Sequence, residues 1–153
     1  MGIIRVYVDT SVFGGIYDDE FKVSILIFFE QVKNQNFILV TSAIVQDEIL
    51  PAPIEVRIFF EEILKIAETA DITEESLKLR EAYLEAKIVS PKYSDDALHV
   101  AIATIAGCNL IVSWNFKHIV HFQKIPLYNA INMINGYNQI AIYSPLEVIK
   151  YEE

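Results

Sequence analysis

The chain of 153 residues contains a single cysteine, Cys108, so no disulfide can form within it. Free thiols are typical of reducing intracellular compartments, and we therefore expect a cytoplasmic protein. Glycine and proline are also scarce, at 5 residues each, and there is no internal repeat or low-complexity linker. With 53% hydrophobic residues, these absences exclude both a disulfide scaffold and a disordered chain. We predict one domain over residues 1–153.

Positive charge is also in short supply, because 12 basic residues face 21 acidic ones and the formal net charge is −9. Such a chain does not hold nucleic acid through a global positive field, which leaves open a local basic rim or contact through metal ions. The scatter of the basic residues in the sequence favours a solvated surface over one phosphate-binding face. The candidates for such a rim are Arg57, Lys78, Arg80, Lys87, Lys92, Lys117 and Lys124.

One stretch without charge, Leu98–Phe116, is long enough to suggest a membrane span. It is interrupted by Gly107-Cys108-Asn109 and carries the polar residues His99 and Thr104. A buried helix, a turn and a buried strand explain this pattern better. We therefore predict a soluble protein without membrane association.

Short β-rich segments alternate with segments of helical periodicity along the whole chain. The predicted strands are Ile3–Val8, Phe37–Val40, Leu110–Ser113, Pro126–Tyr128 and Ile140–Ser144. The predicted helices are Phe21–Asn34, Ser42–Leu50 capped by Ser42, Glu55–Glu68, Thr73–Ala86, Asp95–Ala106 capped by Ser94, and Ile131–Tyr137. This order predicts an α/β protein, a three-layer α/β/α sandwich with a mainly parallel sheet of about five strands.

Acidic and polar residues follow the predicted strands at the edge where a parallel sheet binds ligands. Asp9 ends the first strand, Glu48 lies in the helix after the second, and Asp96 opens the helix before the third. Taken singly, each has a simpler explanation as a turn former, a helix cap or a solvated side chain. Together, three carboxylates would repel one another unless a cation lies among them. Oxygen ligands of this kind suit Mg²⁺ or Mn²⁺.

Four motifs in succession resemble those of the PIN-domain nucleases, whose largest group is the VapC-type toxins. They are Val6-Tyr7-Val8-Asp9-Thr10-Ser11, Thr41-Ser42 through Asp47-Glu48-Ile49, Ser94-Asp95-Asp96-Ala97-Leu98-His99-Val100-Ala101, and Val112-Ser113-Trp114-Asn115. The resemblance extends from residue 1 to about residue 145, in the family's order. Each motif alone is weak evidence, and the four in order are considerably stronger.

The resemblance implies a Mg²⁺- or Mn²⁺-dependent ribonuclease, the toxin of a type II toxin–antitoxin module. In that family pattern Asp9 and Asp96 would hold the cation and Glu48 would orient or deprotonate the attacking water. Asn115 matches a polar position after a strand of the family's sheet, and Ser11 matches a hydroxyl near the metal. The expected partners are an RNA substrate, a cognate antitoxin protein and a second copy of the chain in a homodimer.

The sequence departs from the family pattern at His118, which stands where many members have a fourth acid. This histidine could contact the scissile phosphate or protonate a leaving oxygen, or it could be an ordinary capping or surface residue. We count it, with Ser113, among the supporting site residues. A zinc site of His118, His121 and Cys108 is disfavoured because no fourth ligand has the right spacing.

Two other functions remain open at this stage. A phosphatase using Asp9 as nucleophile would commonly have a second aspartate two residues later, where this chain has Ser11. A catalytically weak or inactive module acting through protein partners is the second alternative. The aromatic residues are expected mainly in the core, although Phe59, Phe60 and Tyr83 could instead form a partner surface.

Overall fold

The structure, a computed structural model, describes residues 3–34 and 37–150. Its strands are β1 (Arg5–Val8), β2 (Ile38–Ser42), β3 (Glu68–Ala70), β4 (Leu110–Val112) and β5 (Ala141–Tyr143). Its helices are α1 (Thr10–Gly14), α2 (Lys22–Asn34), α3 (Ala43–Ile49), α4 (Ile54–Leu64), α5 (Glu74–Glu85), α6 (Ser94–Ile105), α7 (Ile125–Ile134) and α8 (Pro145–Val148), with 3₁₀ turns η1 (Gly15–Tyr17) and η2 (Pro91–Tyr93).

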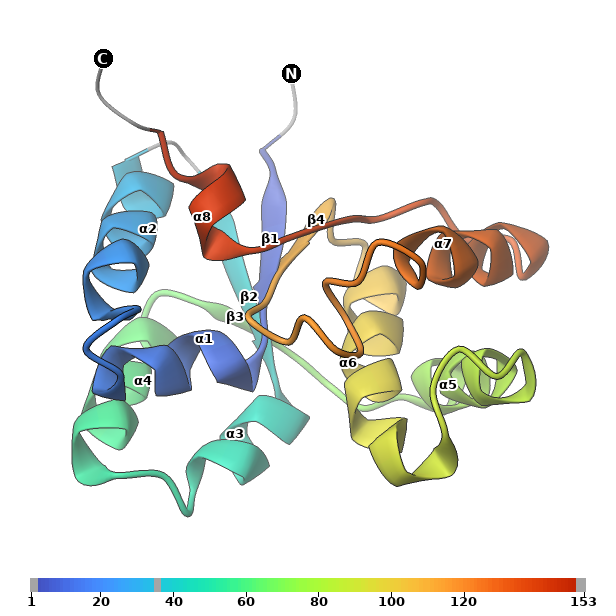
Figure 1. Ribbon diagram of the computed structural model, residues 1–153, viewed down its shortest axis with the longest axis horizontal. Coiled ribbons are helices and arrows are strands. Elements are labelled where there is room, and N and C mark those ends of the chain that lie inside the picture. The colour runs from blue at the N-terminus through green and yellow to red at the C-terminus, as the bar shows by residue number, and fades with distance from the viewer. Residues whose placement is uncertain (1–2, 35–36, 151–153) are drawn as a thin grey trace.

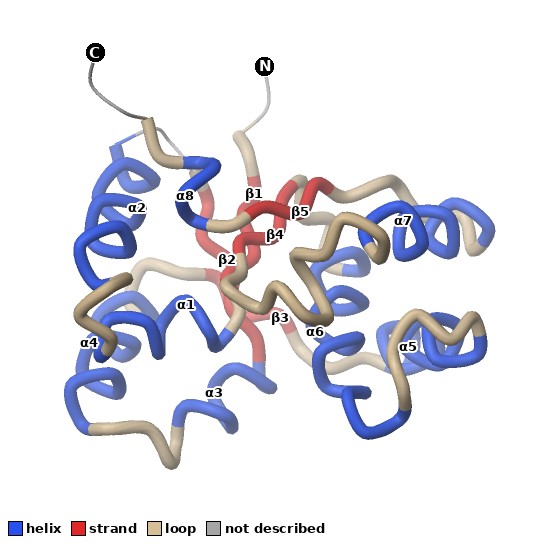
Figure 2. The backbone as a smooth tube through the Cα atoms, viewed as in Figure 1, coloured by secondary structure: helices blue, strands red, loops and turns tan. Residues whose placement is uncertain are grey.

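The five strands form one parallel sheet in the order β3-β2-β1-β4-β5. Helices α2, α4 and α8 lie on one side of this sheet and α5, α6 and α7 on the other (Figures 1 and 2). The central strand β1 is consequently covered on both faces, and Val6, Tyr7 and Val8 are all buried. The predicted three-layer α/β/α class is confirmed.

Two strand predictions need correction. Pro126–Tyr128 is not a strand, because Pro126 stands in the first turn of α7, where a missing N–H costs nothing. The fifth strand of the sheet is instead β3, which lies at the edge of the sheet and was not predicted. Its first residue, Glu68, was expected to end the helix Glu55–Glu68. Glu68 and Thr69 are exposed there, so β3 has no apolar pattern, and it is identified only by its pairing with β2.

Of the two predicted helix caps, Ser42 is confirmed and Ser94 is not, and a third cap occurs at Thr73. Ser42 Oγ accepts the backbone N–H of Val45, and Thr73 caps α5 in a capping box with Ser76. Ser94 is not a cap, because η2 continues directly into α6 and Ser94 is the first residue of α6. The short helices α1 and α8 were not predicted.

Most of the aromatic residues lie in the core or pack against it, as expected, whereas Tyr17, Phe116, Phe122 and Tyr143 are exposed. Phe60 and Tyr83 are buried, and Phe59 packs at 5.0 Å between ring centroids against Phe29. The alternative in which Phe59, Phe60 and Tyr83 form a partner surface is therefore wrong. Phe13, on α1, packs edge-on against Phe60 with 5.0 Å between the ring centroids.

Gly15 lies where α1 meets α2, and a side chain there has no room. An added Cβ would lie 2.2 Å from Ile25 Cδ1 and 3.3 Å from Trp114 Nε1. We expect Gly15→Ala to destabilise the fold by about 1–3 kcal/mol through overpacking. Gly14→Ala is the matched control, because nothing lies within 4 Å of its Cβ position. Urea unfolding followed by Trp114 fluorescence measures both, and equal midpoints for the two variants would contradict the prediction.

No helix among residues 3–34 and 37–150 has both the length and the apolar character needed to cross a membrane.

Candidate active site

Asp9 is held at the carboxyl end of β1 by two serine hydroxyls. Ser11 Oγ donates to its Oδ1 at 2.6 Å and Ser113 Oγ donates to its Oδ2 at 2.7 Å. The serines in turn accept backbone N–H groups, Trp114 N–H to Ser11 Oγ and Asn115 N–H to Ser113 Oγ, both at 2.9 Å. The segment after β4 is thereby fixed against the end of β1, and the orientation of the carboxylate is set from both sides.

The electrostatic surroundings of Asp9 leave its negative charge incompletely compensated. Only 3% of the residue is exposed, and burial raises the pKa of its carboxyl group. The charge of His99 and the hydrogen bonds from Ser11 and Ser113 oppose this rise without cancelling it. A cation bound beside Asp9 would offset this cost of burying the charge. The burial of Asp9 is therefore the first feature that fits a metal site.

Glu48, on α3, faces the same edge with one oxygen engaged. Its Oε1 accepts Thr10 Oγ1 at 2.9 Å and lies 2.6 Å from His99 Nε2. Burial raises the pKa of Glu48, but the bonds from His99 and Thr10 outweigh it and the pKa is lowered. Glu48 is therefore ionised at neutral pH, and within the described residues Oε2 has no hydrogen-bond partner.

A chain of hydrogen bonds runs from Glu48 through His99 into the core. His99 Nδ1 lies 2.7 Å from the hydroxyl of Tyr7, which lies 2.8 Å from Ser42 Oγ, the cap of α3. When His99 is neutral and its proton is on Nε2, every donor in the chain has an acceptor. The order runs from the Val45 N–H through Ser42, Tyr7 and His99 to the Glu48 carboxylate. This chain joins β1, β2, α3 and α6 behind the candidate site.

Asp96 lies in the first turn of α6 and is half-buried, whereas its neighbour Asp95 is exposed. Burial lowers the pKa of His99, but the bond to Glu48 and the charges of Asp9, Glu48 and Asp96 raise it above its ordinary value. Glu48 therefore contacts this buried histidine directly, and Asp9 and Asp96 act on it through their charges.

The carboxylates fit a hard divalent cation through their oxygen donors. Among the described residues no group of three or more His, Cys, Asp or Glu side chains is gathered as tightly as a complete metal site. Mg²⁺ commonly takes only one or two protein carboxylates and keeps several waters, so Asp9 with Asp96 would suffice and Glu48 could act through water. The unrelieved charge on Asp9 and the free Oε2 of Glu48 both suit that arrangement.

Asn115 and His118 form the turn that follows β4. Asn115 Oδ1 accepts the backbone N–H of His118 at 3.0 Å, and the Tyr128 hydroxyl donates to the carbonyl of His118 at 2.8 Å. The side chain of Asn115 therefore stabilises this turn. Cys108 precedes β4 while His118 follows it, at opposite ends of the strand, which separates the residues of the disfavoured zinc site.

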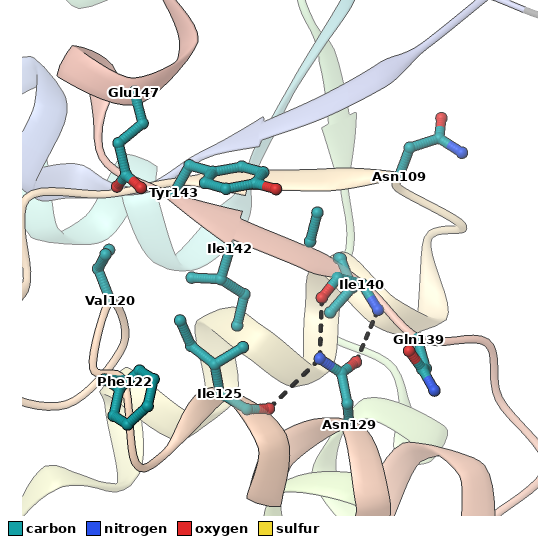
Figure 3. A pocket seen from close by; sticks show the side chains of 11 residues that line it. Asn109, Val120, Phe122, Ile125, Asn129, Gln139, Ile140, Ile142, Tyr143 and Glu147 are labelled. Carbon is teal, nitrogen blue, oxygen red and sulfur yellow. Dashed lines mark hydrogen bonds between the residues drawn. The ribbon is translucent and has the colours of Figure 1, made fainter.

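A cavity of about 660 Å³ lies beside β5 and is distinct from these acids (Figure 3). Its wall includes Phe122, which is 90% exposed, and Asn129, whose amide donates to the carbonyls of Ile125 and Ile140 and accepts the Ile140 N–H. Asn129 thereby ties α7 to the start of β5. None of the predicted site residues lines this cavity, so it is not part of the candidate site, which consists of Asp9, Glu48 and Asp96.

Sequence reasoning missed the residues that connect the acids. His99, Tyr7 and Thr10 were not singled out as site residues. Signals for two of them were present, since His99 follows Asp96 by one helical turn and Tyr7 shares the face of β1 with Asp9.

Comparison with known proteins agrees with this architecture. A VapBC2 structure from Rickettsia felis, described as bound to a DNA fragment from its promoter, is 13% identical with a TM-score of 0.61, covering 92% of this chain and 98% of that one. A tyrosyl-tRNA synthetase from Archaeoglobus fulgidus, complexed with L-tyrosine, is 14% identical with a TM-score of 0.54, covering 95% of this chain and 56% of that one. Both likenesses concern the fold alone. A search of curated sequences gives no match. The PIN domain profile matches residues 6–118, which is most of the sequence, and the chain therefore belongs to the PIN domain family.

Proposed function

We propose that this protein is a Mg²⁺- or Mn²⁺-dependent endoribonuclease that hydrolyses phosphodiester bonds of RNA, the toxin of a type II toxin–antitoxin module in the cytoplasm. The observation that carries the proposal is that Glu48 bonds His99 and that the charges of Asp9 and Asp96 also act on this histidine. Membership of the PIN domain family supports a nuclease at this edge.

Each residue takes the role that its surroundings suit. Asp9 and Asp96 would hold the cation, and Ser11 and Ser113 keep Asp9 oriented toward it. When bound, the metal would polarise a phosphate oxygen and lower the pKa of a water. Glu48 is ionised and has one oxygen free, so it can orient that water and accept its proton.

An antitoxin and a second copy of the chain are the proposed protein partners. The fold shared with the Rickettsia felis VapBC2 structure suggests this context. Helix α2 exposes Val23, Leu26 and Ile27 on one face, and α4 exposes Ile54 and Ile58. Apolar side chains gathered in this way are typical of protein contacts.

The alternative is an inactive PIN module that acts only through protein partners. The observation in its favour is His118, which occupies the place of the family's fourth acid. Retention of the three acids, each with a defined environment, weighs against it. A phosphatase with Asp9 as nucleophile is less well supported, because Ser11 stands two residues later and its hydroxyl is bonded to Asp9.

The deciding experiment incubates the purified chain with labelled single-stranded RNA and Mn²⁺ or Mg²⁺. We expect cleavage that stops on addition of EDTA and is absent in the Asp96→Asn variant. Cleavage that persists in EDTA would contradict the metal dependence. Absence of cleavage over varied RNAs, together with no Mn²⁺ binding by calorimetry, would favour the inactive module.

A further inference from the structure

Two lysines lie over one aromatic ring beside the candidate site, and a third contacts the histidine that stacks on that ring. Lys92 Nζ and Lys117 Nζ each lie 5.6 Å from the centroid of the Tyr93 ring. The same ring stacks on His118 at 3.9 Å between centroids, and Lys124 Nζ lies 3.4 Å from His118 Nδ1. We call Tyr93, His118, Lys92, Lys117 and Lys124 the Tyr93 cluster.

Among the residues that the structure describes, no acidic side chain pairs with a lysine of the Tyr93 cluster. None of Lys92, Lys117 and Lys124 makes an ion pair within the residues that the structure describes, although the chain has 21 acidic residues against 12 basic ones. Three like charges near one ring repel one another, and a purely structural cluster would be expected to include a carboxylate. Their arrangement therefore suits an anion from outside the chain.

The His118 side chain provides a second observation, a buried ring nitrogen without a hydrogen-bond partner among the described residues. Because Lys124 can only donate, it requires a lone pair on Nδ1, which places the proton of the neutral ring on Nε2. Burial and the neighbouring Lys124 also lower the pKa of His118, which favours that neutral form. Nε2 is buried and has no hydrogen-bond partner in the described chain, and only 8% of the residue is exposed. An N–H donor left in this state is costly and suits an acceptor oxygen.

The Tyr93 cluster adjoins the acids. Asp96 follows Tyr93 by three residues and its charge acts on His118, while Asn115 Oδ1 holds the backbone of His118. An RNA strand bound at Asp9 and Asp96 would pass over this neighbouring surface. Since the chain as a whole repels RNA, local positive charge at that point is what such a strand needs.

We infer that the Tyr93 cluster is a binding subsite for a backbone phosphate of the RNA strand next to the cleaved bond, with Lys92, Lys117 and Lys124 as its charged contacts. This inference rests on the proposed ribonuclease function and assigns a substrate contact to it. It also revises the expectation that the basic residues are only a solvated surface, for these three of the seven candidates.

The test measures binding of a fluorescein-labelled oligouridylate to the full chain in EDTA, by anisotropy over a range of salt concentrations. One variant combines Lys92→Gln, Lys117→Gln and Lys124→Gln. Its control combines Lys33→Gln, Lys65→Gln and Lys150→Gln, which carries the same net charge of −9 − 3 = −12. Lys33 stands in the last turn of α2 and Lys65 directly follows α4, so both lie on the side of the amino ends of β2 and β3, away from the carboxyl edge that holds the acids.

Loss of three phosphate contacts should reduce the slope of log affinity against log salt by about 2, at about 0.7 for each contact with a single strand. The control should keep the wild-type slope. His118→Phe, which keeps a ring against Tyr93 but removes Nε2, should weaken binding without changing the slope. With Mn²⁺ present, the triple cluster variant should raise KM and leave kcat unchanged.

Equal slopes for the cluster variant and wild type, or equal losses in both triple variants, would overturn the subsite. Binding of labelled polyglutamate that depends on the three lysines, without such dependence for RNA, would overturn it in favour of an acidic protein segment. If the wild type cleaves RNA but the slopes do not change, only the subsite fails. If the slopes change but no RNA is cleaved, the subsite is supported and the ribonuclease function fails.

Discussion

Asp9→Asn is expected to reduce RNA cleavage by about 10³-fold or more, because it removes the charge nearest the proposed cation. The substitution keeps the shape of the side chain, and its carbonyl oxygen can still accept the Ser11 hydroxyl. The variant should fold, and Mn²⁺ titration calorimetry should show that it no longer binds the metal. The same titration on the wild type gives the reference affinity.

Stability provides a second measurement of the same charge. Folding raises the pKa of Asp9, so the ionised carboxylate disfavours the folded state as the pH rises from the unfolded pKa of about 3.9 through the folded pKa. At pH 7 this penalty acts on the wild type in EDTA, and the Asn variant, which lacks it, should be at least as stable as the wild type. Mn²⁺ at about 100 times its Kd should stabilise the wild type by about 2.7 kcal/mol and leave the variant unchanged.

The control for Asp9→Asn is Asp95→Asn, which removes an exposed carboxylate one residue before Asp96. This variant should cleave RNA and bind Mn²⁺ as the wild type does. A large loss of activity in Asp95→Asn, with Asp9→Asn still active, would mean that the wrong carboxylates have been assigned to the metal.

The parts of the fold that were predicted from the sequence are those in which burial leaves a pattern. The strands β1, β2, β4 and β5 were found because they are short apolar runs bounded by polar residues. Edge strand β3 gave no such signal, since Glu68 and Thr69 are exposed and Glu68 is paired with Arg5 across the sheet at 2.6 Å. The strand predicted at Pro126–Tyr128 was wrong because these residues are equally compatible with a strand and with the start of a helix.

The same distinction holds for the candidate site. Asp9, Glu48 and Asp96 could be placed at one edge because the ends of parallel strands meet there. Their connection through His99 depends on contacts between residues 51 and 92 positions apart, which no local pattern reports. The convergence of Lys92, Lys117 and Lys124 was missed for that reason, and the sequence favoured a solvated surface.

His99→Ala is expected to have the second-largest effect. It leaves the buried Tyr7 hydroxyl without its acceptor and opens a cavity in place of the ring, which together should cost about 2–4 kcal/mol of unfolding free energy, while the partly exposed Glu48 loses its Nε2 donor. Cleavage should also fall, by about 10²-fold, because Glu48 would be held only by Thr10. Urea unfolding and single-turnover cleavage measure the two effects separately.

Two milder variants separate positioning of Glu48 from general stability. Tyr7→Phe removes the hydroxyl between Ser42 and His99 and should cost about 1–3 kcal/mol, while Glu48 keeps its histidine donor and cleavage stays near the wild-type rate. His99→Gln offers an amide N–H to Glu48 and should recover part of the cleavage that His99→Ala loses. If Tyr7→Phe and His99→Ala lost cleavage only in proportion to their stability, the histidine would have no positioning role.

The interaction between His99 and Glu48 should make stability depend on pH in a way that packing alone would not. Folding raises the pKa of His99, so its contribution is complete below the unfolded value of about 6.5 and is lost as the pH rises through the folded pKa. Folding lowers the pKa of Glu48, so its contribution is present above about 4.3 and is lost as the pH falls through the folded pKa. In EDTA, the wild type should therefore exceed His99→Gln in stability most between about pH 4.3 and 6.5, with a smaller difference above that range. A difference that did not vary with pH would reduce His99 to a packed side chain, and Glu48 would then need another source of its orientation.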